Sequence, residues 1–267
     1  MGEQQPLPAD IEARGHVAAR IAKSAGVRAK AFLKDRSSLT PSQKSSSQDL
    51  VSAVDRATEA HLRRMIRKHF PQDGIVGEEA GRSEGTTEFV WVIDPIDGTM
   101  AYLVGQPNWT VSIAVLHRDQ PVIGVVHAPI LRELYVAMKG KGATLNGLPL
   151  AINESWSIRS TTIGYGGTER ADPREVGAFV TRLYEEGGVL FRVGSGALML
   201  AYVAANRLAG YYDPTLFCWD CLAGMVLIRE AGGKAEFAGD LASPGPIWAG
   251  NAQVFSDLKR LSGGMEA

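Results

Sequence analysis

The sequence has 267 residues, of which 45% are hydrophobic and 21% are charged. This composition is that of a folded globular protein and excludes a disordered chain. The 28 basic and 29 acidic residues leave a formal net charge of −1. That balance excludes a general polyanion-binding protein, so any anion site must be built locally. No apolar run is long enough to span a bilayer, and the start lacks the apolar segment of a secretory signal, so we expect a cytoplasmic protein without membrane attachment.

The first half of the sequence predicts two helices followed by a mostly antiparallel sheet. Small and apolar residues that recur every three or four positions predict helices over Pro8–Arg36 and Ala53–His69. The polar segment 37–48 between them contains a proline and is expected to be a loop. The Asn146–Gly147 pair predicts a hairpin. The β-rich runs are Gly74–Gly77, Phe89–Ile93, Thr110–Leu116, Val122–His127 and Glu133–Met138.

From Ser160 onward, strand-like and helix-like segments alternate, which predicts an α/β arrangement. The expected strands are Thr161–Gly164, Val189–Val193, Gly210–Tyr212 and short ones near Lys234 and Ile247. The expected helices are Pro173–Glu186, Ser195–Asn206, Trp219–Ala231 and one after Asn251. We therefore expect an α+β half over residues 1–155 and an α/β half over 156–267, which together form one catalytic unit. Clefts between such halves are common ligand sites.

The two cysteines, Cys218 and Cys221, have the spacing of a redox or zinc motif. A structural zinc site needs about four ligands, and the sequence has no second cysteine pair. An aspartate, Asp220, also lies inside the motif, which is unusual for a redox pair. We therefore expect two buried thiols.

The segment FVWVIDPIDGT, residues 89–99, is the most informative about chemistry. We expect its apolar strand to end at Asp94, because Pro95 opposes further strand pairing. Asp94 and Asp97 can then turn toward one point, and Gly98 can open a short helix whose free N–H groups would bind an anion. Carboxylates beside an anion site are what Mg²⁺-dependent phosphoryl chemistry needs. A capped turn is the structural alternative.

Other acidic residues lie at strand ends and helix starts. Glu78 and Glu79 follow a β-rich run, and Asp55 and Asp220 lie near the starts of predicted helices. Each has an ordinary alternative, namely a solvated turn for the glutamates and a helix cap or dipole contact for the aspartates. Those alternatives do not explain why the acidic groups are combined with a glycine-rich segment, residues 193–196, that opens a helix.

Five motifs, in this order and spacing, resemble those of the inositol monophosphatase family. They are Lys44–Asp55, Gly77–Glu79, Trp91–Thr99, Gly194–Ala197 and Trp219–Gly224. The resemblance extends from about Ile11 to Leu258. It implies a layered αβαβα sandwich, usually a homodimer, that hydrolyses small phosphate monoesters with Mg²⁺ and is inhibited by lithium.

The resemblance also implies individual roles, with two or three Mg²⁺ ions per active site. The implied metal ligands are Glu78, Asp94 and the Ile96 carbonyl for a first ion, and Asp94, Asp97 and Asp220 for a second. The implied catalytic residues are Thr99 and Asp55, which orient and deprotonate the attacking water, with Glu79 and Lys44 at supporting positions. The implied substrate-binding residues are Ile96, Asp97, Gly98, Thr99, Gly194, Ser195, Gly196, Asp213 and Asp220.

The sequence offers no obvious covalent nucleophile. Ser195 has no histidine close in sequence, and no G-x-S-x-G turn occurs. Direct in-line attack by water at the metal site is therefore favoured over a phospho-enzyme. A metal centre neutralises the charge of the phosphate ester and stabilises the leaving alkoxide.

The departures from the family pattern lie around the substrate. Ala101 replaces the usual asparagine, Gly196 replaces the usual alanine, and Asp213 replaces a glutamate that meets a substrate hydroxyl in inositol-specific members. An inositol or sugar-alcohol monophosphate is the first expectation. The alternatives are 3′-phosphoadenosine 5′-phosphate, fructose 1,6-bisphosphate and histidinol phosphate. A site that binds adenine needs an aromatic or arginine side chain that stacks on the base, and the sequence alone does not locate one near the cleft.

An alternative of another class is a regulatory family member that binds a protein partner and retains a vestigial site. The near-zero net charge and the lack of a basic run argue against direct nucleic-acid binding.

Overall fold

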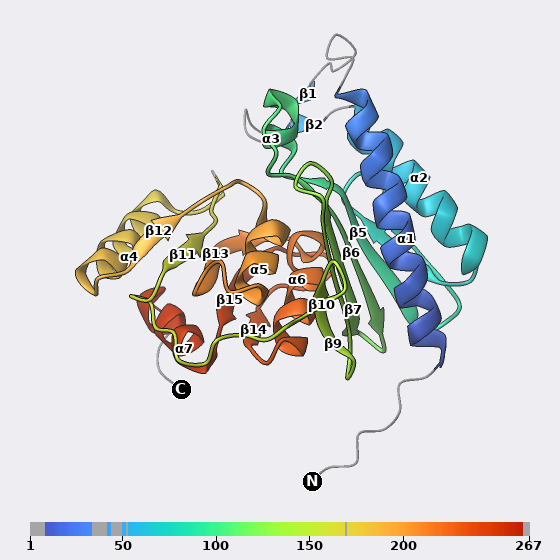
Figure 1. Ribbon diagram of the computed structural model, residues 1–267. Helices are drawn as coiled ribbons and strands as arrows, with labels where there is room; N and C mark the ends of the chain where they lie inside the picture. Colours follow the sequence, from blue (N-terminus) through green and yellow to red (C-terminus); the bar gives the residue numbers. More distant parts are fainter. Residues whose placement is uncertain (1–8, 34–41, 44–49, 52, 169, 264–267) are drawn as a thin grey trace.

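The computed structural model describes residues 9–33, 42–43, 50–51, 53–168 and 170–263 (Figure 1). Its helices are α1 (Ala9–Phe32), α2 (Ala53–His69), α3 (Thr99–Val104), α4 (Pro173–Glu185), α5 (Gly196–Ala204), α6 (Cys218–Glu230) and α7 (Ala252–Leu261). Most of the expected loop 37–48 lies outside the described residues, as does Lys44. Ser42–Gln43, inside the expected loop, instead form the short strand β1, which pairs with β2 (Leu50–Val51) just after it.

The first half forms an eight-stranded sheet in the order β10-β9-β8-β7-β6-β5-β3-β4. Its strands are β3 (Gly74–Gly77), β4 (Gly81–Ser83), β5 (Phe89–Asp97), β6 (Thr110–His117), β7 (Gln120–Ala128), β8 (Glu133–Met138), β9 (Gly142–Leu145) and β10 (Leu148–Leu150). Neighbouring strands are antiparallel except for β3 and β5, which are parallel. The short strand β4 is an addition to the sequence prediction.

The second half forms a five-stranded sheet in the order β12-β11-β13-β15-β14. Its strands are β11 (Thr162–Tyr165), β12 (Val189–Phe191), β13 (Gly210–Leu216), β14 (Lys234–Phe237) and β15 (Gly245–Gly250). The strands β12, β11 and β13 are mutually parallel, and β15 and β14 add antiparallel to them.

The two sheets and their helices form five layers (Figure 1). Helices α1 and α2 cover the outer face of the large sheet, α5 and α6 fill the space between the sheets, and α4 and α7 cover the far face of the small sheet. The layered arrangement explains why the sequence of β5 is almost continuously apolar. Trp91 and Ile93 pack under α1 and α2, whereas Val92 packs with α5 and α6, so both faces of the strand are buried. The αβαβα sandwich is confirmed.

The strand β5 differs from the sequence prediction at its end. It does not stop at Asp94 but continues to Asp97, because Pro95 and Ile96 lie in a bulge between the pairs Asp94–Ser112 and Asp97–Thr110. Proline is tolerated at a bulge because no ladder hydrogen bond is required of it there. The bulge places both aspartates in the sheet rather than in a turn beyond it.

Two further expectations concern the thiols and the membrane. Cys218 and Cys221 are free and buried, as expected, and burial raises the pKa of Cys218 to about 12. Such a thiol is inert at neutral pH.

Among the helices in the described part of the chain, none is long and apolar enough to cross a bilayer. The cytoplasmic location stays a prediction.

Candidate active site

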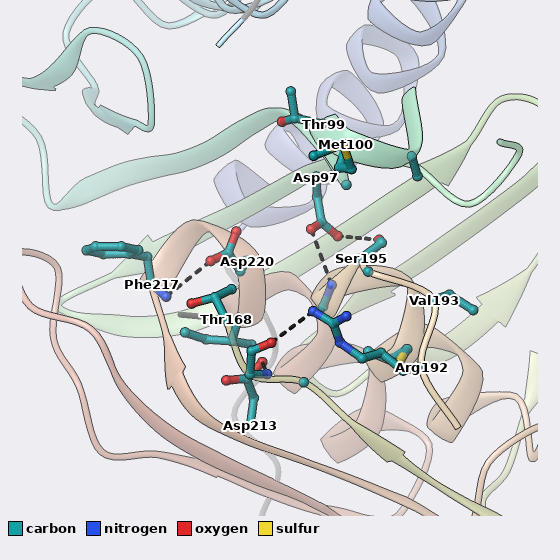
Figure 2. A pocket seen from close by; sticks show the side chains of 18 of the residues that line it. Asp97, Thr99, Met100, Thr168, Arg192, Val193, Ser195, Asp213, Phe217 and Asp220 are labelled. Carbon is teal, nitrogen blue, oxygen red and sulfur yellow. Dashed lines mark hydrogen bonds between the residues drawn. The ribbon is translucent and has the colours of Figure 1, made fainter. Parts of the chain in front are cut away.

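A cavity of about 590 Å³ lies where the end of β5 and the start of α3 meet the small sheet (Figure 2). The chain segments that follow the parallel strands β11 and β12 line it, together with the end of β13. The helices after these strands leave toward opposite faces, with α4 packed beside α7 and α5 beside α6. Ligands of open α/β sheets bind at the carboxyl ends of strands where connections diverge in this way.

Three aspartates meet at the floor of this region. Asp94 and Asp97 lie on either side of the β5 bulge, and Asp220 lies in the first turn of α6. One carboxylate oxygen from each lies within 4.8 Å of the others. The Ile96 N–H inside the bulge donates to Asp94 Oδ1 at 2.9 Å, so the bulge orients the carboxylate. The expected convergence of Asp94 and Asp97 on one point is observed.

Burial raises the pKa of all three carboxyl groups. The pKa of Asp94 lies well above its usual range, because the group is buried and because Glu78, Asp97 and Asp220 are negative neighbours. Burial raises the pKa of Asp97 to about 6 and that of Asp220 to about 7. Carboxylates held together in this way are relieved by a cation, and oxygen donors suit a hard ion such as Mg²⁺. The residues present therefore fit a divalent metal ion.

The Asp97 carboxylate joins the two halves of the chain. Its Oδ2 accepts hydrogen bonds from Ser195 Oγ at 2.5 Å, Ala197 N at 2.8 Å and Thr110 Oγ1 at 3.3 Å, and its Oδ1 accepts one from Gly196 N at 3.2 Å. A carboxylate has about four lone-pair sites, so Oδ1 retains one for a cation. The N-terminus of α5 thus holds Asp97 rather than a free anion.

Ser195 is the N-cap of α5, and its Oγ accepts from Leu198 N at 3.2 Å while it donates to Asp97. Its side chain is fully buried. The hydroxyl therefore has an internal role, which agrees with the absence of a covalent serine nucleophile.

Thr99 and Asp55 form a second pair beside the aspartates. Gly98 adopts the left-handed conformation with φ 91°, which turns β5 directly into α3. Thr99 Oγ1 then lies 3.1 Å from the Ile96 carbonyl oxygen and 3.5 Å from Asp55 Oδ1. Asp55 is 1% exposed and lies inside α2 rather than at its N-cap. Two distant motifs therefore meet in a hydroxyl–carboxylate pair.

The turn that carries Glu78 is held by a residue that the sequence analysis missed. The buried Glu59 accepts from Glu79 N at 2.6 Å, from Ala80 N at 3.0 Å and from Arg63 Nε at 2.7 Å. In the sequence, Glu59 and Arg63 look like an ordinary exposed pair four residues apart on a helix. No local pattern indicates that the glutamate binds the β3–β4 turn.

This site combines a cluster of oxygen donors, a hydroxyl–carboxylate pair and an adjacent cavity, and residues 7–239 match the inositol monophosphatase family. The chain belongs to the inositol monophosphatase family.

Individual relatives carry two kinds of name. The Nus factor SuhB of Haemophilus influenzae is 39% identical over 223 residues, covering 82% of each chain. A protein of Aquifex aeolicus named fructose-1,6-bisphosphatase/inositol-1-monophosphatase is 33% identical over 206 residues, covering 76% of this chain and 78% of the relative. The crystal structure of the extragenic suppressor protein suhB from Bartonella henselae superposes with a TM-score of 0.88 at 29% identity, covering 94% of this chain and 98% of that one.

In this inositol monophosphatase family member, most of the predicted site residues lie at or beside the cavity. Those that line the cavity are Glu78, Asp97, Gly98, Thr99, Gly194, Ser195, Gly196, Asp213 and Asp220. Asp94 completes the cluster, and Asp55 and Ile96 lie behind Thr99. Glu79 is not among the lining residues, and its backbone N–H faces Glu59. The assigned metal, catalytic and substrate roles stay predictions.

Asp213, which stands where the family usually has glutamate, is held by its own surroundings. Its Oδ2 accepts from Gly167 N and Tyr211 Oη, both at 3.0 Å, and its Oδ1 accepts from Thr215 N at 2.9 Å. The residue is 3% exposed, and burial raises its pKa. A Cβ on Gly166 would lie 1.5 Å from Asp213 Oδ2, so that glycine makes room for the carboxylate.

Two arginines and the Phe217 ring also line the cavity, and the sequence analysis missed all three. Arg192 Nη2 donates to the Gly167 carbonyl at 2.9 Å. The Arg170 guanidinium lies 5.2 Å from the Phe217 ring centroid, and Phe217 stacks on Trp219 at 4.7 Å. Isolated arginines carry no sequence signal. Arg192 could have been noticed only because it directly precedes the glycine-rich segment.

Proposed function

We propose that this protein is a Mg²⁺-dependent phosphomonoesterase that hydrolyses a small-molecule phosphate ester by direct attack of water. The observation that carries the proposal is the cluster of the buried Asp94 and Asp97 with the half-buried Asp220, whose oxygens lie within 4.8 Å of one another beside the cavity. Crowded carboxylates with raised pKa values are costly to maintain for structure alone. Perturbed carboxyl groups in a cleft are typical of functional sites.

The residues that would hold the metal are Asp94, Asp97, Asp220, Glu78 and the Ile96 carbonyl. When bound there, Mg²⁺ supplies charge neutralisation for the phosphate and acidifies a coordinated water. The hydrogen bonds to Asp97 from α5 fix this ligand in one orientation. Fixing carboxylate ligands through their hydrogen-bond partners tunes affinity and activity in metal sites generally.

The chain's own contribution to proton transfer is the pair Thr99 and Asp55. A water that donates to Thr99 Oγ1 can lose its proton as the threonine O–H passes its own proton to Asp55 Oδ1. The 3.5 Å separation of these atoms is within the range of catalytic hydrogen bonds that tighten when substrate binds. The Ile96 carbonyl at 3.1 Å holds the same hydroxyl in place until then.

The proposed substrate is an inositol phosphate or a related sugar phosphate, and the proposed assembly is a homodimer. The cavity volume of about 590 Å³ lies within the range of small-molecule sites. The Aquifex relative named for both fructose 1,6-bisphosphate and inositol 1-phosphate supports a site that accepts more than one alcohol.

Phosphate release from a panel of esters, with Mg²⁺ and with EDTA, tests the proposal. The panel contains inositol 1-phosphate, glycerol 2-phosphate, fructose 1,6-bisphosphate, histidinol phosphate and 3′-phosphoadenosine 5′-phosphate. We expect Mg²⁺-dependent release that Asp97→Asn and Asp220→Asn each reduce by at least about 100-fold. The matched control is Asp119→Asn, in the exposed turn between β6 and β7. Failure of every ester to react in Mg²⁺ would overturn the proposal.

A second candidate function is regulation through a protein partner, favoured by the relatives named Nus factor SuhB. The double variant Asp97→Asn with Asp220→Asn separates the two functions in a strain that lacks the gene. An enzymatic role predicts that the double variant fails to restore the wild-type phenotype. Full restoration by a variant without phosphatase activity would assign the role to partner binding.

A further inference from the structure

The strand β6 carries two buried hydroxyl groups beside the aspartate cluster. Every second residue of this strand faces α5 and α6, namely Thr110, Ser112, Ala114 and Leu116. The last two are apolar members of the core between the sheets, whereas the first two are polar and fully buried. A buried hydroxyl is costly unless it is hydrogen-bonded, and alanine or valine would fill the same space. The two hydroxyls therefore indicate a role other than packing.

Ser112 links the large sheet to the first turn of α6. It lies directly opposite Asp94 in the β5–β6 pair, and its Oγ donates to the Trp219 carbonyl oxygen at 3.0 Å. Trp219 immediately precedes Asp220, whose Oδ2 accepts from Phe217 N at 3.1 Å. The serine hydroxyl thus joins the residue opposite one aspartate of the cluster to the residue next to another.

Thr110 has the corresponding place beside Asp97. The two residues lie opposite each other in the same pair of strands, and Thr110 Oγ1 donates to Asp97 Oδ2 at 3.3 Å. This hydrogen bond comes from the large sheet, whereas the three from Ser195, Gly196 and Ala197 come from the start of α5. Donors from two layers of the fold therefore limit the rotation of the Asp97 carboxylate.

The hydrogen bond from Ser112 is not needed to satisfy the Trp219 carbonyl. A carbonyl at this place in an α-helix also accepts the N–H of the residue four positions later, which here is Ala223. The helix lies very close to the sheet at this point, because a Cβ on Gly124 of β7 would collide with the Ala223 carbonyl oxygen. Close packing brings α6 onto the sheet, and the serine hydroxyl fixes where its first turn lies.

We infer that Ser112 and Thr110 are positioning residues that set the separation of the carboxylates in the cluster and thereby select Mg²⁺ over larger cations. The inference rests on the proposed function, because it concerns the same metal-binding residues. Mg²⁺ requires oxygen ligands at about 2.0–2.1 Å in near-ideal octahedral geometry, whereas Ca²⁺ accepts about 2.3–2.6 Å in a flexible arrangement. Carboxylates that are held by β6 as well as by their own elements suit the smaller and more demanding ion.

Titration calorimetry of the metal-free protein with MgCl₂ and with CaCl₂ tests the inference without any ester. The variants are Ser112→Ala, Thr110→Val and the two combined. Removal of a hydrogen-bond partner of a metal ligand weakens metal binding by about 10–100-fold, and we expect a loss of this size for Mg²⁺ in the double variant. Because Ca²⁺ tolerates a wider site, the ratio of the Mg²⁺ to the Ca²⁺ dissociation constant should rise at least about fivefold.

Two further variants separate positioning from a general loss of packing. Thr110→Ser keeps the hydroxyl and should bind both cations within about twofold of the wild type. Thr144→Val is the matched control, because Thr144 Oγ1 donates to the Val136 carbonyl oxygen at 3.4 Å on β9, which β7 and β8 separate from β6. It should leave the Mg²⁺ to Ca²⁺ ratio unchanged.

A merely structural role for the two hydroxyls predicts a lower melting temperature with an unchanged ratio. A ratio within about twofold of the wild type in the double variant therefore overturns the inference, whatever the melting temperature. If the double variant does not fold, Ser112→Ala decides by the same criterion, because the Trp219 carbonyl keeps its helical hydrogen bond in that variant.

Failure of the proposed function gives a different result. If no ester of the panel is hydrolysed although the wild type binds Mg²⁺, the phosphatase proposal is wrong, and the calorimetric ratio still decides the inference. If esters are hydrolysed and the ratio does not change in the double variant, the inference alone is wrong. A wild-type protein that binds neither cation overturns both.

Discussion

Replacing Glu59 by glutamine tests whether the helix α2 positions the turn that carries Glu78, a proposed metal ligand. Glu59 Oε1 accepts from Arg63 Nε and Ala80 N, and Oε2 accepts from Glu79 N at 2.6 Å. An amide oxygen can replace Oε1, but its NH₂ group must then face the Glu79 N–H. That backbone donor loses its partner, and the turn that carries Glu78 loses its anchor.

The expected destabilisation follows from these contacts. One backbone donor left unsatisfied in a largely buried position costs about 1–3 kcal/mol. The weakened pair with Arg63 costs up to about 1 kcal/mol more, because the amide oxygen still accepts from Arg63 Nε and the arginine keeps its hydrogen bond to Ser83. The total of about 1–4 kcal/mol corresponds to a fall in melting temperature of about 2–16 °C for a chain of this size.

Two assays check the Glu59→Gln variant, namely thermal melting and the Mg²⁺ concentration that gives half-maximal activity. We expect both stability and Mg²⁺ affinity to fall. The control is Glu84→Gln, because Glu84 forms an exposed pair with Arg82 near the same turn and should change stability by less than about 0.5 kcal/mol. If Glu59→Gln melts within 1 °C of the wild type and keeps its Mg²⁺ dependence, the anchoring role is refuted.

Removal of the Thr99 hydroxyl in Thr99→Val should lower kcat by about 100-fold or more without changing the melting temperature. The variant Thr99→Ser keeps the hydroxyl and should retain most activity. Equal kcat in both variants would contradict the proton-transfer role. Asp97 and Asp220 have folded-state pKa values of about 6 and 7, above the usual value for aspartate, so their protonation stabilises the metal-free fold at low pH and this stabilisation is lost as the pH rises toward 7. Because Mg²⁺ must displace those protons, the rise in melting temperature that Mg²⁺ causes relative to EDTA should be larger at about pH 8 than at about pH 5.5, and a rise independent of pH would contradict this. Lithium at tens of millimolar should inhibit hydrolysis, and unchanged activity would count against that family trait. Light scattering should give the mass of two chains, and a single-chain mass would exclude the homodimer.

The sequence predicted the aspartate cluster better than the cavity around it. Asp94 and Asp97 share one strand, so their spacing and the following glycine indicate their convergence directly. Asp220 could be placed near them only through the family resemblance, because no local pattern relates α6 to β5. The bounds of α2 could also be predicted from the sequence, because Pro71 ends the helix pattern, and the helix spans Ala53–His69 as predicted.

The errors and omissions have long-range causes. The end predicted for β5 was wrong because the effect of Pro95 on pairing was considered without the bulge that β6 permits. The hydrogen bonds of Ser195, which caps α5 and binds Asp97 from the other half of the chain, could not be read from the sequence, and its substrate-binding role stays a prediction. Arg170 and Arg192 were missed because an isolated arginine has no periodicity and acquires its meaning only when the strands place it at a cavity.

The four hydrogen bonds that converge on Asp97 also bear on how the two halves of the chain are held together. They join β5 and β6 of one sheet to the start of the helix between the sheets, so loss of this carboxylate leaves buried donors unsatisfied on both sides of the junction. Asp97 is therefore a cross-link of the fold as well as a member of the acidic cluster, and its replacement should loosen the packing of α5 against the large sheet.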